Sequence, residues 1–164
     1  RGICHFQNGD EYEGDYDQGE RTGEGIFKYA NGDRYTGHFS EGERDGMGSF
    51  VWANGDRYEG MWKSDLLNGH GKLTKKNGDI FEGDFINGKI DGQVIIHYAN
   101  GTRFKGTYKN GMRNGKAIEE TKEGIRFEGT YVNDRRDGKF VEKDRNGTVM
   151  FTGHYENGRK FNDQ

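Results

Sequence analysis

Two rows of arginine recur at a fixed spacing and are the side chains with the clearest capacity for binding chemistry. One row follows an Asn-Gly pair and comprises Arg34, Arg57, Arg103 and Arg126. The second row comprises Arg21, Arg44, Arg113 and Arg136. A guanidinium binds carboxylates and phosphates through a planar fork of donors, so such rows suit acidic headgroups or acidic peptide side chains. Acidic residues accompany both rows (Asp33, Asp56, Glu20 and Glu43), and local charge neutralisation is the alternative.

The residue types needed for catalysis or metal binding occur without the spacing that they require. None of the five histidines stands at ligand spacing from a cysteine or a second histidine. The stretch GMRNGK at 111–116 has three residues between its glycines instead of the four of a phosphate loop, and Ala117 stands where Ser or Thr binds magnesium. The acidic run 11–17 lacks a calcium-binding loop and is typical of a solvated sheet face. We therefore expect no catalytic residue, no metal site and no cofactor.

The composition narrows the classes of partner. A net charge of −3 gives no electrostatic footprint for nucleic acid and weakens the case for a membrane or phosphoinositide partner, which only the arginine rows support. The single cysteine, Cys4, permits no internal disulfide and favours a reducing compartment. We expect a cytoplasmic protein, with association to cytoskeleton or membrane left open. The chain begins with Arg1 instead of Met, which leaves open that it is part of a longer protein.

An internal repeat is the feature that must position these side chains. The pattern aromatic-x-Gly-x-aromatic occurs seven times, at intervals of 23 residues and once of 24, beginning at Tyr12, Tyr35, Tyr58, Phe81, Phe104, Phe127 and Phe151. All 29 glycines fall in five columns of this repeat. Glycine confined to columns indicates a required backbone conformation or a close approach.

Each repeat is predicted to form a β-hairpin. Residues 12–16 alternate between aromatic or glycine and polar residues, which is the period of a strand with one buried face. Residues 17–23 are predicted to be a loop, and residues 25–29 the second strand. An Asn-Gly pair follows in six of the seven repeats and predicts a type I′ turn. One face of these hairpins is aromatic with glycine gaps, so that a ring can lie against bare backbone, and the other is acidic and polar.

This pattern, with its Gly-x-Gly and Asn-Gly pairs on a 23-residue period, resembles the MORN repeat family over the whole chain. The resemblance implies an all-β fold, an elongated and twisted single antiparallel sheet of tandem hairpins curled into an open groove. We expect one array over 1–164, with a partial unit 1–11 and repeats from about 12, 35, 58, 81, 104, 127 and 151. The pattern departs from the family in later repeats, where Val94, Ala117 and Phe140 replace the second glycine.

The aromatic face is the candidate binding site. Its rings serve either only as the core of a single-layer sheet or also as a groove for a peptide or helix of another protein. The predicted groove residues are Tyr12, Tyr16, Phe27, Tyr35, Phe39, Phe50, Trp52, Tyr58, Trp62, Phe81 and Phe85, with Arg34 and Arg57 at the rim.

The predicted function is that of a non-enzymatic scaffold that binds a protein partner. Two alternatives stay open. The resemblance also implies an accessory arm of a larger enzyme, such as a SET-domain methyltransferase or a lipid kinase. An unpaired edge strand would allow self-association into a cytoskeletal or membrane-linked scaffold.

Overall fold

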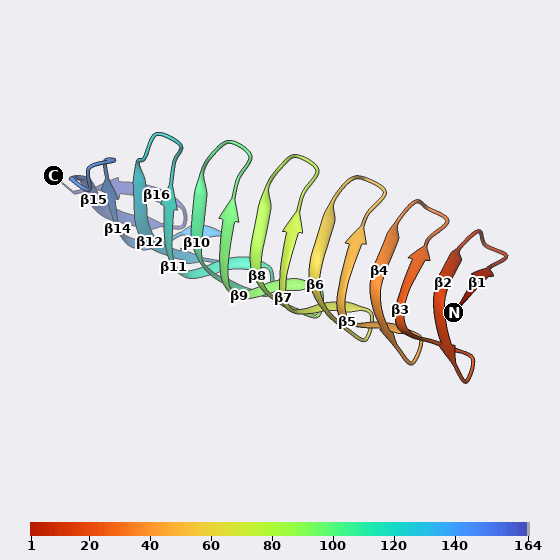
Figure 1. Ribbon diagram of the computed structural model, residues 1–164. Helices are drawn as coiled ribbons and strands as arrows, with labels where there is room; N and C mark the ends of the chain where they lie inside the picture. The colour runs from red at the N-terminus through yellow and green to blue at the C-terminus, as the bar shows by residue number, and fades with distance from the viewer. Residues whose placement is uncertain (164) are drawn as a thin grey trace. The chain divides into compact units, whose positions relative to one another are not determined.

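The computed structural model describes residues 1–163, so Gln164, the last residue of the predicted array, lies outside the described residues. Within 1–163 the chain has sixteen strands and no helix. The strands form an open antiparallel sheet in which sequence neighbours pair, except that the two-residue β13 lies off the path and pairs with β12 (Figure 1). The predicted all-β fold of tandem hairpins is confirmed.

The chain divides into two compact units. Unit 1 comprises residues 1–77 and 85–88, and unit 2 comprises residues 78–84 and 89–163. The strands of unit 1 are β1 (Gly2–His5), β2 (Glu11–Asp17), β3 (Glu20–Lys28), β4 (Arg34–Ser40), β5 (Glu43–Val51), β6 (Arg57–Lys63) and β7 (Leu66–Thr74). Strand β8 (Ile80–Ile86) contributes to both units. Unit 2 continues with β9 (Lys89–His97), β10 (Arg103–Lys109), β11 (Met112–Glu120), β12 (Arg126–Val132), β13 (Arg135–Arg136), β14 (Gly138–Lys143), β15 (Val149–Glu156) and β16 (Arg159–Asn162).

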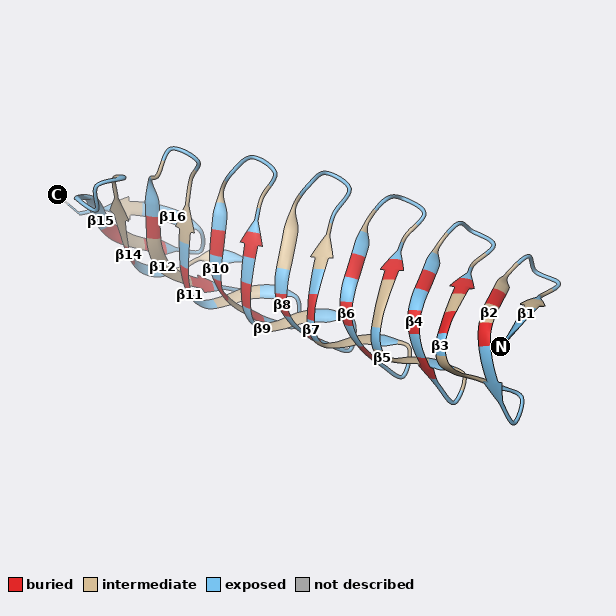
Figure 2. Cartoon of the chain, in the orientation of Figure 1, coloured by how far each residue is buried: buried red, intermediate tan, exposed pale blue. Residues whose placement is uncertain are grey.

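Strand alternation places the aromatic residues on one face, as predicted. In β4, Tyr35, Gly37 and Phe39 are buried while every residue between and beside them is exposed. Strand β6 repeats this pattern, and Figure 2 shows the buried segments recurring along these strands. We call the buried face the inward face and the opposite one the outward face.

The Asn-Gly turns differ from the prediction. A type I′ turn needs positive φ at both central residues, but of Asn31 and Gly32 only the glycine has positive φ, at 100°. The Gly32 amide donates to the Tyr29 carbonyl at 3.0 Å, and the Tyr29 amide donates to the Asp33 carbonyl at 2.9 Å. This is a three-residue loop closed by a left-handed glycine. The Asn31 Oδ1 accepts the Asp33 amide at 2.9 Å, which explains why asparagine is used here without positive φ.

The type I′ turns lie at the other end of the hairpins, where a loop over 17–23 was predicted. Gln18 and Gly19 have φ of 50° and 82°, and Asp17 pairs directly with Glu20. The second strand therefore begins at Glu20 instead of residue 25, and a register shift against β2 after Gly14 accommodates the two extra residues as a bulge. Three loops of this class carry Asn-Gly themselves, at 87–88, 110–111 and 157–158, and this was the available signal for the correct assignment.

Aspartate joins one Asn-Gly turn to the next. The Asp33 Oδ1 accepts the Ala53 amide at 2.7 Å, twenty residues along the chain. Asp10 accepts the Ala30 amide in the same way, at 2.7 Å. The Asp56 Oδ1 accepts the Lys76 amide at 2.8 Å, and this bond lowers the pKa of the Asp56 carboxyl. The aspartate of the repeated sequence ANGD thus connects successive hairpins.

Candidate functional site

A tyrosine lies across a pair of facing glycines in each of the first three repeats. Gly37 in β4 pairs with Gly48 in β5, and a Cβ placed on Gly48 would lie 2.2 Å from the Tyr35 hydroxyl oxygen. That hydroxyl passes over the glycines and donates to the His38 carbonyl at 2.7 Å. Tyr12 and Tyr58 donate to the Asp15 and Met61 carbonyls at 2.9 Å in the same arrangement. Bare backbone beneath a ring was predicted, and the hydroxyl anchor was not.

The sequence of unit 2 changes both members of this arrangement together. Repeats with tyrosine at the first aromatic position have glycine opposite the motif glycine, whereas the repeats of Phe81, Phe104 and Phe127 have Val94, Ala117 and Phe140 at the equivalent position of the second strand, as where Gly106 pairs with Ala117. Phenylalanine has no hydroxyl to carry across the facing residue. The core of unit 2 accordingly contains these apolar side chains, and Val94, Ala117 and Phe140 are at most 5% exposed.

The structure places most predicted groove residues in the core. The exposed fraction is 0% for Tyr12, Tyr35 and Tyr58, and the buried set also includes Phe27, Phe39, Phe50, Trp62 and Phe85. These rings pack on one another: Trp62 meets Tyr35 edge to face and Phe50 at a tilt, at centroid distances of 5.3 and 5.7 Å. Their role in packing is clear, and they present little surface to a partner. Contact with a partner stays a prediction for them.

The predicted groove residues with exposed surface are Tyr16, Trp52 and Phe81. Tyr16 is 42% exposed, and Trp52 and Phe81 are partly buried. Arg34 and Arg57 are exposed, but they alternate with buried tyrosines and so lie on the outward face. They do not border the inward rings, and a rim role for them stays a prediction.

A row of half-buried rings lies beside the Asn-Gly turns of unit 1. Phe6, Tyr29 and Trp52 occupy equivalent positions of successive repeats and are all partly exposed. The buried rings Phe27 and Phe50 lie between them, with centroid distances of 5.9 Å for Phe6 to Phe27, 4.5 Å for Phe27 to Tyr29, 5.8 Å for Tyr29 to Phe50 and 4.7 Å for Phe50 to Trp52. We call these five residues the aromatic ladder. Sequence reasoning did not select Phe6 and Tyr29, although their 23-residue spacing from Trp52 was the signal.

The second arginine row covers the inward face of unit 1. The Arg44 guanidinium carbon lies 4.7 Å from the Trp62 ring centre and 5.3 Å from that of Phe50. Its Nε donates to the Asp65 Oδ1 at 3.0 Å, and its Nη2 donates to the Asp65 carbonyl at 3.0 Å. Asp65 stands where other repeats have a turn glycine and holds a positive φ of 68°. A paired arginine therefore stabilises aspartate in a conformation that usually favours glycine.

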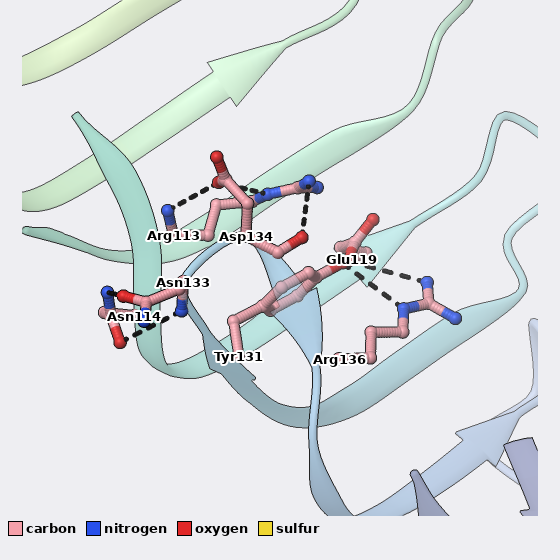
Figure 3. A network of polar contacts seen from close by, with 7 residues as sticks. All are labelled: Arg113, Asn114, Glu119, Tyr131, Asn133, Asp134 and Arg136. Carbon is pink, nitrogen blue, oxygen red and sulfur yellow. Dashed lines mark hydrogen bonds and ion pairs between the residues drawn. The ribbon is translucent and has the colours of Figure 1, made fainter. Parts of the chain in front are cut away.

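Unit 2 repeats this pairing and adds an inward ion pair (Figure 3). Arg113 donates from Nε to the Asp134 Oδ1 at 3.2 Å. The Tyr131 hydroxyl donates to Glu119, and Arg136 Nη2 lies 3.5 Å from Glu119 Oε1. Glu119 stands where the earlier repeats have Phe27, Phe50, Leu73 and Ile96, so an ion pair takes the place of apolar packing at this position. Burial and the Glu119 bond raise the pKa of Tyr131 to about 12.

The chemistry available to these sites is that of recognition. No group of His, Cys, Asp and Glu in residues 1–163 has an arrangement that would bind a metal ion. Likewise, within the described part of the chain no helix could cross a membrane. The absence of catalytic residues and of a cofactor stays a prediction.

A family model for MORN repeats matches residues 12–34, 35–57, 58–80, 81–103, 104–124 and 127–149. The chain belongs to the MORN repeat family. The six matched MORN repeats cover most of the chain, and the β15–β16 hairpin follows as the remaining aromatic-x-Gly-x-aromatic unit. No curated protein sequence matches the chain significantly.

Solved structures support the fold of this MORN array. The chain is similar to the TCP domain of SAS-4 from Drosophila melanogaster, with 17% identity, a TM-score of 0.60 and coverage of 94% of this chain and 83% of that one. It is also similar to the TCP10c domain of Drosophila melanogaster Sas-4, with 18% identity, a TM-score of 0.56 and coverage of 94% and 91%. At these identities the likeness concerns the fold alone.

Proposed function

We propose that this MORN array is a non-enzymatic scaffold that binds an extended segment of a protein partner on the aromatic ladder of unit 1. The observation that carries the proposal is the partial exposure of Phe6, Tyr29 and Trp52 at one position of three successive repeats. The buried rings between them fix their orientation before a partner arrives, and ordering a ring in advance lowers the entropic cost of binding.

The spacing of the ladder fits a polyproline II peptide. Neighbouring strands lie about 4.8 Å apart, so equivalent rings of successive hairpins are roughly 9.6 Å apart. A polyproline II helix rises about 3.1 Å per residue with three residues per turn, which returns the same side of the peptide every 9.3 Å or so. A peptide that crosses the strands would therefore present every third residue to a ring. Aromatic-lined surfaces are a general means of recognising proline-rich segments.

A structural neighbour supports this class of partner. The Drosophila SAS-4 TCP domain, which shares the fold, forms a complex with a proline-rich motif of Ana2. We propose the same chemical class for this chain because the ladder spacing favours it independently. The accessory arm of a larger enzyme and self-association have no comparable observation in their favour.

Peptide selection tests the proposal. A library of random twelve-residue peptides displayed on phage is selected against the 164-residue chain, and the affinities of the selected peptides are measured. Because exposed aromatic anchors dominate peptide interfaces, Trp52→Ser is expected to cost about 2 kcal/mol, roughly 30-fold in affinity. Met47→Ser, which changes an exposed residue on the outward face, is the matched control. Selected peptides that bind Trp52→Ser as tightly as the parent chain would refute the placement of the site.

A further inference from the structure

Three hollows adjoin one another on the outward face and turn edge of unit 2. The first, of about 430 Å³, lies between the β11–β12 and β14–β15 turns and is lined by Lys122, Arg126, Lys143 and Arg145. The second, of about 520 Å³, lies over Lys105, Lys116 and Ile118. A third, of about 300 Å³, shares Lys105 and Ile118 with the second and Arg126 with the first. The hollows therefore form one continuous surface, which we call the basic surface.

The charge of this surface opposes that of the chain. Seven basic and three acidic residues line the three hollows, although the whole chain carries a net charge of −3. Two cations are neutralised locally: Lys143 Nζ lies 3.1 Å from Glu128, and Arg126 lies 3.4 Å from Glu120 and 3.6 Å from Glu128. The other five, Arg103, Lys105, Lys116, Lys122 and Arg145, form no ion pair with residues of the described chain 1–163.

The turn residues change character within unit 2. The amides of Ala30, Ala53, Lys76 and Ala99 are each held by the aspartate of the preceding turn. The next two equivalent positions are Lys122 and Arg145, and the residues at the corresponding aspartate positions are Thr102 and Ile125. These last two turns thus combine a basic residue with the loss of that aspartate. Lys122 and Arg145 are both exposed, with no aspartate to bind their amides.

Apolar side chains lie among these cations. Ile95 and Ile118 are 40% and 42% exposed, and each is the cross-strand partner of Lys105 between them. They lie two strands apart, roughly 9.6 Å. A peptide in the polyproline II conformation rises about 3.1 Å per residue with three residues per turn, so every third side chain would lie on the same side at roughly 9.3 Å and match this spacing. The exposed isoleucines among the cations favour a ligand that carries apolar as well as acidic side chains.

We propose that the basic surface of unit 2 binds an acidic peptide segment in the polyproline II conformation, with an aliphatic residue at every third position. The carboxylates would pair with Lys122, Arg145 and Lys105, and the aliphatic residues would cover Ile95 and Ile118. This site is separate from the aromatic ladder and goes beyond the proposed function, because it recognises a second class of segment by charge.

A synthetic peptide with the sequence Glu-Glu-Leu repeated four times tests the proposal, with Gln-Gln-Leu repeated four times as the neutral probe. Binding to the 164-residue chain is measured by fluorescence anisotropy at low and moderate salt. We expect the acidic peptide to bind at least about tenfold more tightly, and salt to weaken it. Lys122→Glu combined with Arg145→Glu should weaken the acidic peptide by about tenfold or more, and Ile118→Ser by several-fold.

The matched control is Arg34→Glu combined with Lys63→Glu, which adds the same charge to exposed positions of unit 1. An equal loss of peptide affinity in both double variants would show that only net charge matters and would overturn the proposal. Unchanged peptide affinity in Ile118→Ser would also overturn it. Binding to phosphatidylserine vesicles without binding to the peptide would assign the surface to membranes instead. Trp52→Ser should leave binding of the acidic peptide unaffected. The two proposals can therefore fail separately: a negative result for the basic surface does not test the aromatic ladder, and a negative result for the ladder does not test the basic surface. Circular dichroism confirms that each variant is folded.

Discussion

Replacing Gly48 with alanine tests whether the tyrosine-over-glycine arrangement holds the array together. An added Cβ would lie 2.2 Å from the Tyr35 hydroxyl oxygen and 2.4 and 2.5 Å from two ring carbons. Contacts below 3.0 Å require movement, and Tyr35 is fully buried against Phe39 and Trp62. Displacing the ring breaks its bond to the His38 carbonyl, worth about 1 kcal/mol, and overpacks the core, which costs about 1–3 kcal/mol.

The expected loss in the free energy of unfolding is therefore about 2–4 kcal/mol, measured by urea denaturation. Gly2→Ala is the matched control, because Gly2 occupies the same repeat column and a Cβ there meets nothing within 4 Å. It should change stability by no more than about 0.5 kcal/mol.

A second substitution tests whether the Tyr35 hydroxyl is the group that an added Cβ displaces. Tyr35→Phe removes the hydroxyl, as in the repeat where Phe104 precedes Gly106 and Gly106 pairs with Ala117. The double variant Gly48→Ala with Tyr35→Phe should lose less unfolding free energy than the two single variants lose in sum, by about 1 kcal/mol or more. Additive losses, or a Gly48→Ala variant as stable as the parent chain, would refute the reasoning.

Two further predictions concern stability. Arg21 Nε is buried without a hydrogen-bond partner in residues 1–163, and Gly42 stands where Asp65 binds Arg44, with φ of 81° and open space for a Cβ. Gly42→Asp should supply the missing acceptor and raise the unfolding free energy by about 1 kcal/mol, net of the cost of a non-glycine residue at positive φ. Gly42→Ala, which bears that cost without an acceptor, should lower the unfolding free energy. A melting temperature that falls equally for both variants contradicts this prediction. Burial raises the pKa of Tyr58 to about 12 from its ordinary value near 10. The contribution of the neutral Tyr58 hydroxyl to the unfolding free energy is therefore present below about pH 10 and is lost as the pH rises towards 12. Tyr58→Phe should lose less stability than the parent chain over that interval in urea titrations, and an unchanged pH dependence would contradict the assignment.

Much of the fold could be predicted because its determinants are local and repeated. The two-residue alternation around Gly37 fixes which rings are buried, and the 23-residue period fixes the hairpin order. The turn types could not be assigned from Asn-Gly alone. At Asn31 a side-chain bond to the next aspartate favours a three-residue loop, whereas Gln18-Gly19 forms the type I′ turn without asparagine.

The candidate site was harder to predict, because exposure depends on contacts between repeats. Trp62 and Trp52 are equally aromatic in sequence, but Trp62 meets the tyrosines of two repeats and donates its indole Nε1 to the Gly48 carbonyl at 3.2 Å. Trp52 keeps exposed surface beside a turn. The arginines that cover the inward face were interpreted through nearby acids, but the partner of Arg44 is Asp65 of the following turn.

The two tryptophans also provide the most direct test of the proposed function, since the chain contains no others. A proline-rich peptide, Pro-Pro-Leu repeated four times, is titrated into ¹⁵N-labelled chain while the two indole N–H signals are followed by NMR. Binding on the aromatic ladder predicts a progressive shift of the Trp52 signal with the Trp62 signal unmoved, and loss of binding in Trp52→Ser. A shift of the Trp62 signal alone, or no shift of either at millimolar peptide, would contradict binding of this class of segment on the ladder.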